Sequence, residues 1–83
     1  MDELFQRLDS AEKHIANVKN KVARKDLLKM VRGVDQAIVA TDMESVECRR
    51  MHRETARYRE LVQTVDTLLT NLEQHITLAN LLG

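Results

Sequence analysis

Two residue types that bind metal ions occur together once in the chain, in Cys48 and His52. Four residues apart on a helix, the thiol and the imidazole leave the same face and can reach one ion. A zinc site needs three or four such ligands, and the sequence has no matching second pair. We therefore interpret both as isolated surface residues and predict no metal site and no cofactor.

Ser10 and Ser45 carry the hydroxyl groups to consider for nucleophilic catalysis. A catalytic serine needs a histidine and an acid placed to activate it, and neither serine has these neighbours in the pattern. The chain also has only two glycines and no glycine-rich loop that could hold a phosphate. We therefore predict no catalytic residues and expect that the protein is not an enzyme.

The charged residues are arranged in alternating blocks, although the formal net charge is zero. Residues 13–32 sum to +6 and residues 48–59 to +4. In a hairpin folded near residue 41, these blocks meet as a basic band in the middle of a rod. The band is either a solvated face with local ion pairs or a contact surface for an acidic protein, and nucleic acid is disfavoured because no aromatic platform accompanies it. The candidate contacts for an acidic partner are Arg49, Arg50, Arg53, Arg57 and Arg59.

Helices must carry these side chains, because apolar residues recur every three or four positions near both ends of the chain. The first stripe consists of Leu4, Leu8, Ala11, Ile15, Val18 and Val22. The second consists of Tyr58, Val62, Val65, Leu69, Leu72, Ile76 and Ala79. With no proline, no tryptophan and one phenylalanine in 83 residues, the composition also predicts an all-α protein.

The stripes predict three helical segments, at 2–23, 26–40 and 43–80. The middle segment has its own apolar stripe, Leu27, Val31, Val34 and Ile38, which points about 150° away from the first stripe. The chain therefore either bends at 23–26 or continues as one helix that contacts different neighbours along its length. We favour the continuous helix, because 23–26 contains neither glycine nor proline. The sequence Thr41-Asp42-Met43-Glu44 has the form of a capping box, which predicts a turn at 40–42.

The predicted fold is a single domain, 1–83, built as an antiparallel helical hairpin, or as a three-helix bundle if the chain bends at 23–26. A chain of this length buries little core alone, so we expect oligomerisation or a partner helix to complete it. The predicted interface residues are the apolar ones of the three stripes: Leu4, Leu8, Ile15, Val18, Val22, Leu27, Val31, Val34, Ile38, Val62, Val65, Leu69, Leu72 and Ile76. The first stripe is expected to meet the last, leaving the 27–38 face for another chain.

The apolar runs are too short to span a bilayer, and the start of the chain is acidic, unlike a secretory signal. One cysteine cannot form a disulfide within the chain. We therefore expect a cytoplasmic protein.

Residues 44–73 resemble the last helix of BAG-domain cochaperones. The similarity lies in Glu44-Ser45-Val46-Glu47, in 57–62 (Arg-Tyr-Arg-Glu-Leu-Val) and in the leucines of 68–73. The family's Arg-Lys pair reads Tyr58-Arg59 here, and its downstream polar contact falls on Asp66. The resemblance implies a three-helix bundle that binds the ATPase domain of a cytosolic heat-shock chaperone.

From the residues themselves we expect a non-catalytic protein–protein interaction module, a coiled-coil assembly subunit, scaffold or adaptor that acts through its apolar seams. The alternatives are a regulator that binds an acidic protein or nucleic acid through the basic band, and a BAG-like chaperone cofactor.

Overall fold

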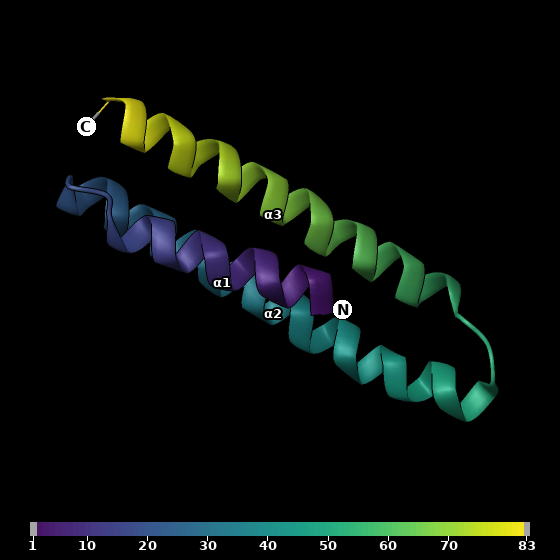
Figure 1. Cartoon of the computed structure of the whole chain (residues 1–83). Coiled ribbons are helices and arrows are strands. Elements are labelled where there is room, and N and C mark those ends of the chain that lie inside the picture. The colour runs from purple at the N-terminus through teal and green to yellow at the C-terminus, as the bar shows by residue number, and fades with distance from the viewer. Residues whose placement is uncertain (1, 83) are drawn as a thin grey trace.

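Three helices make up the part of the chain that the structure, a computed structural model, describes, residues 2–82. They are α1 (Asp2–Ala16), α2 (Lys21–Met51) and α3 (Ala56–Leu82). Helices α2 and α3 form a long antiparallel hairpin, and α1 lies along one half of it, parallel to α3 (Figure 1). The result is a rod with extents of 48 × 17 × 14 Å. The predicted all-α fold is confirmed in its three-helix form.

All three helices contribute to one apolar core. The first and last stripes meet in it, as predicted, and the middle stripe joins them. The buried residues are Leu8, Ala11, Ile15, Val18, Leu27, Val31, Val34, Ile38, Val65, Leu69, Leu72 and Ile76. Leu4 packs against this core and is partly buried.

The first turn lies at 17–20, so the predicted helix 2–23 is wrong at its end, and so is the preference for a helix that continues into the middle segment. Val18 remains buried inside the turn, whereas Val22, on the new helix, is 71% exposed. The two apolar stripes point in different directions because α1 and α2 are separate helices.

Asn20 starts α2, because its side-chain oxygen accepts hydrogen bonds from the backbone N–H groups of Val22 (2.9 Å) and Ala23 (3.1 Å). These N–H groups have no partner within the helix. The Asn20→Ala substitution should lower the free energy of unfolding by about 1 kcal/mol, measured by urea denaturation. Asn20→Asp, which keeps the accepting oxygen, is the control, and equal losses in both variants would contradict the capping role.

The second turn lies at 52–55, so the predicted turn at 40–42 and the bounds 26–40 and 43–80 are wrong. Thr41 is fully buried in the middle of α2, and its hydroxyl donates to the Ala37 carbonyl oxygen (2.7 Å). The hydroxyl is therefore satisfied one helical turn back and does not cap a new helix. The continuous last helix that the BAG resemblance implies is likewise broken, because 44–51 belongs to α2 and 56–73 to α3.

Helix α2 ends in a Schellman motif. His52 adopts the left-handed conformation (φ 57°), its N–H donates to the Arg49 carbonyl oxygen (3.3 Å), and the Arg53 N–H donates to that of Cys48 (3.1 Å). Thr55 then starts α3, since its side-chain oxygen accepts from the Tyr58 N–H (3.1 Å). Both ends of the turn are held by specific hydrogen bonds.

Gly33 lies inside α2, where a Cβ atom would have no neighbouring atom within 4 Å. Glycine in a helix interior loses more backbone entropy on folding than alanine does. The Gly33→Ala substitution should therefore raise the free energy of unfolding by about 0.5–1 kcal/mol, measured by urea denaturation. A loss of stability would mean that another chain packs closely against Gly33.

Candidate interaction surface

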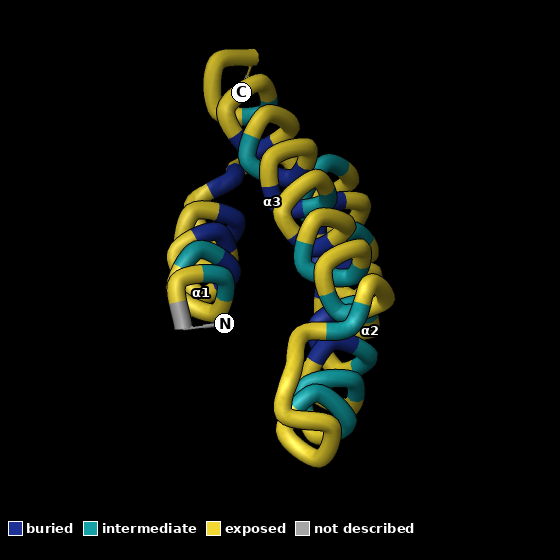
Figure 2. Tube along the Cα trace, turned by 90° about the vertical axis from the view of Figure 1, so that its right-hand side faces the viewer, coloured by how far each residue is buried: buried dark blue, intermediate teal, exposed yellow. Residues whose placement is uncertain are grey.

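The outer half of the α2–α3 hairpin lacks the third helix that covers the inner half. We call residues 42–62 the hairpin tip. Helix α1 has 15 residues and α2 has 31, so α1 reaches along about half of α2. Figure 1 shows the N-terminus of α1 beside the middle of the hairpin, and Figure 2 shows the tip extending beyond it.

The core stops where α1 begins. The last buried residue of α2 is Thr41, and the first of α3 is Val65. Beyond them the seam between α2 and α3 continues through Ser45, Cys48, Tyr58 and Val62, all of which are partly buried. Figure 2 shows the same change, with buried segments in the three-helix half and intermediate or exposed ones at the tip.

A polar cluster nevertheless gives the tip a defined structure. Glu44 is its centre, with 17% of its side chain exposed. Its carboxylate accepts a hydrogen bond from the Thr55 hydroxyl (2.9 Å) and lies 3.7 Å from the Arg57 Nε. The Thr55 N–H also donates to the Cys48 Sγ (3.4 Å). The turn is thus tied to α2 by side chains as well as by the chain itself.

Apolar side chains on α2 point outward near and within the tip. Val39, Met43 and Val46 are each more than half exposed, and Met51 is 42% exposed. Exposed apolar residues are ordinary when scattered, but these four lie within the end of one helix. Val39, Met43 and Val46 lie outside the predicted apolar stripes.

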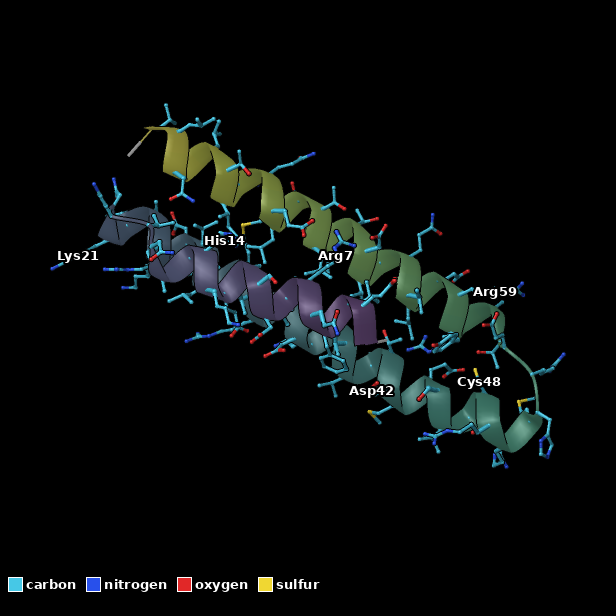
Figure 3. The ribbon with its side chains drawn as sticks, viewed as in Figure 1. Arg7, His14, Lys21, Asp42, Cys48 and Arg59 are labelled. Atoms are coloured by element: carbon cyan, nitrogen blue, oxygen red, sulfur yellow. The ribbon has the colours of Figure 1, made fainter. Side chains whose placement is uncertain are left out.

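The predicted central basic band is wrong, because the hairpin turns at 52–55 and not near residue 41. The first basic block, residues 13–32, lies on both sides of the turn between α1 and α2, and the second surrounds the turn at the opposite end. Figure 3 shows Lys21 and Arg59 at these two ends. The structure therefore separates the two blocks and concentrates the five candidate arginines at the tip.

Two of these arginines are paired and three are not. Arg50 pairs with Glu47, which lowers the pKa of the Glu47 carboxyl through their hydrogen bond, and Arg57 pairs with Glu44. Within residues 2–82, Arg49, Arg53 and Arg59 have no carboxylate oxygen within 4.0 Å. These three guanidinium groups are exposed and available to an acidic partner.

Arg7 joins α1 to α3 in the three-helix half. Its guanidinium donates to Glu73 (2.7 Å), Asp66 (2.5 Å) and Thr70 (3.2 Å). The hydrogen bonds to Glu73 and then Asp66 raise the pKa of Arg7 further above its usual value. This forked contact marks the side of α3 that faces α1.

The predicted interface residues are mostly internal. Leu27, Val31, Val34 and Ile38, expected to be left for another chain, are buried in the core of this chain. That prediction is wrong because α1 is short and folds back at 17–20, which brings the middle stripe into the same core as the other two. Val62 is partly buried, and of the predicted interface residues it is the one that lies within the hairpin tip.

The serines and the cysteine considered for chemistry make contacts with residues near them in the sequence. His14 Nδ1 donates to the backbone carbonyl oxygen of Ser10 (2.7 Å), and the Ser45 hydroxyl donates to the backbone carbonyl oxygen of Asp42 (2.6 Å). Among the described residues no three His, Cys, Asp or Glu side chains are grouped to hold a metal ion, and none of the three helices has the length and apolarity to cross a bilayer. Cys48 makes its contacts with Thr55.

No protein-family model, curated protein or solved structure matches this chain, so its own surface is the basis for a functional proposal.

Proposed function

We propose that the chain is a helical interaction module, without catalytic activity, that binds another protein on the hairpin tip. The observation that carries the proposal is the end of the core at Thr41 and Val65, where α1 begins. From that point the two-helix seam is partly open, while the three-helix half is closed.

A partner helix on the tip would bury apolar surface that is now in contact with water. Val46 is 58% exposed, and the neighbouring seam residues Tyr58 and Val62 are partly buried. Burial of apolar area is the main favourable term in helix association, at about 25 cal/mol per Å². The polar cluster around Glu44 holds this surface in place, so binding need not order the turn first.

A displayed library of helical peptides tests the proposal. The baits are the wild-type chain and two variants that each add one negative charge, Val46→Glu at the tip and Leu78→Glu near the far end of α3. Both replaced side chains are more than half exposed, so both variants should fold. We expect peptides that bind the wild type and Leu78→Glu but not Val46→Glu.

Folding of each bait is checked by circular dichroism. Binders that are indifferent to Val46→Glu, or a selection that yields no binders, would overturn the tip as the interaction surface. Self-association of the wild type, measured by light scattering at two concentrations and lost in Val46→Glu, would identify the partner as a second copy and leave the proposed function standing.

A further inference from the structure

The seven-residue repeat of α3 shows which residues of the tip lie on the side of the hairpin that α1 occupies. On α3, Asp66 and Glu73 contact Arg7 and directly follow the seam residues Val65 and Leu72. The preceding position of this series, seven residues before Asp66, is Arg59, which directly follows Tyr58.

Helix α2 has a corresponding series on the same side. Thr41 and Cys48 are the seam residues of α2 that correspond, in the seven-residue repeat, to Val65 and Leu72 of α3. In an antiparallel helix pair, the residues that directly follow such seam positions lie along the same side of the seam on both helices. On α2 they are Asp42 after Thr41 and Arg49 after Cys48. We call the side of the tip that lies in line with α1 the track. It is flanked by Arg49 on α2 and Arg59 on α3.

The charge along this track reverses beyond the N-terminal end of α1. In the inner half, α3 presents Asp66 and Glu73, and α1 meets them with Arg7. At the outer end the flanks present Arg49 and Arg59, with Arg53 in the turn between the helices, and Asp42 lies at the inner end of the track. An occupant would therefore need carboxylates where α1 has its arginine.

The track also has an apolar contact surface. Val46 lies four residues after Asp42 and three before Arg49, so it shares their face of α2. Val39 lies three residues before Asp42 on that face, and both valines are more than half exposed. A polar chain without an apolar stripe would leave these side chains in contact with water.

We propose that the partner is an acidic amphipathic helix that lies on the tip in line with α1, with its apolar stripe on Val46 and its carboxylates against Arg49 and Arg59. This inference rests on the proposed function and names the chemical class of the partner. A second copy is a poorer occupant, because joining two tips would bring two sets of unpaired arginines together.

Two synthetic peptides test the charge. Both are three-heptad helices with the same leucines on one face, flanked by glutamates in one and by lysines in the other. Fluorescence anisotropy with the full chain should give a dissociation constant at least about tenfold lower for the glutamate peptide at low salt. The difference should narrow as the salt concentration rises.

Charge reversal in the protein locates the effect. Arg49→Glu/Arg59→Glu should reverse the preference between the peptides, whereas Lys21→Glu/Lys25→Glu, the same charge change at the other end, should leave it in place. All four side chains are exposed, so circular dichroism should show folded variants.

Equal affinity for the two peptides, failure of both to bind, or a preference that survives Arg49→Glu/Arg59→Glu would overturn the acidic-helix inference. Library peptides that need Val46 but carry no acidic flank would do the same while the proposed function still holds. If the library yields no tip-dependent binder at all, the proposed function itself fails.

Discussion

The Leu69→Asp substitution should remove most of the free energy that keeps the chain folded. Leu69 is fully buried in α3, at the level where all three helices contribute to the core. An aspartate there either stays charged without a partner or is protonated, and the leucine's packing is lost in both cases. We expect a loss of about 3–5 kcal/mol, close to the lower limit of the stability of natural domains.

Thermal melting followed by circular dichroism measures this effect, with Leu78→Asp on the same helix as the control. Leu78 is 55% exposed, so its replacement should change the free energy of unfolding by less than about 0.5 kcal/mol. A cooperative melt of Leu69→Asp near the wild-type temperature would mean that the three-helix core is not the folded state in solution.

The core was predictable from the sequence because its pattern is local. Leucine, isoleucine and valine at steps of three and four identify the buried face of a helix without knowledge of its neighbours. Val65, Leu69, Leu72 and Ile76 were therefore predicted correctly as one stripe and are buried together. The contact between this stripe and the stripe of α1 was also predictable, because each buries its apolar surface by packing against the other.

The turns were harder to predict because the residues that form them act through local hydrogen bonds. Asn20 and Thr55 each cap a helix with one side-chain oxygen, and His52 ends α2 in a left-handed conformation that glycine adopts more readily. None of the three is a glycine or a proline, the residues that most clearly mark a turn in a sequence. Asn17 and Asn20 were the visible signals for the first turn, because asparagine favours turns and helix caps.

The capping-box sequence at 41–44 was misleading for a reason that bears on the tip. Thr41 and Ser45 are seam residues of α2, and their small polar side chains interrupt the aliphatic stripe. Beyond Thr41 the seam has only α3 to pack against, so large aliphatic residues there would remain partly in water. Thr41, which resembled the start of a helix in the sequence, and Ser45 therefore mark the place where the core ends.

The candidate surface was predictable only in part. The arginines of 48–59 were identified as possible contacts for an acidic partner, but their position required the turn at 52–55. With a turn near residue 41, the same residues fall in the middle of the rod. Which arginines lack a carboxylate depends on contacts such as that of Glu44 with Arg57, 13 residues apart, which no helical spacing predicts.

Ile15→Ala and Val22→Ala together distinguish the sequence pattern from the observed fold. In the apolar stripe these two residues are equivalent, seven positions apart. In the structure Ile15 is 1% exposed at the end of α1, whereas Val22 is 71% exposed after the turn. Truncation of a buried isoleucine removes its packing and leaves a cavity, which costs about 2–5 kcal/mol.

We therefore expect Ile15→Ala to lower the free energy of unfolding by at least about 2 kcal/mol and Val22→Ala to change it by less than about 0.5 kcal/mol, both measured by urea denaturation. Equal, large losses would place Val22 in a core as well, as in one continuous first helix. Equal, small losses would mean that α1 does not pack on the hairpin. In that case the track proposed for a partner at the tip would extend along the whole rod, because the face that α1 now covers would be open too.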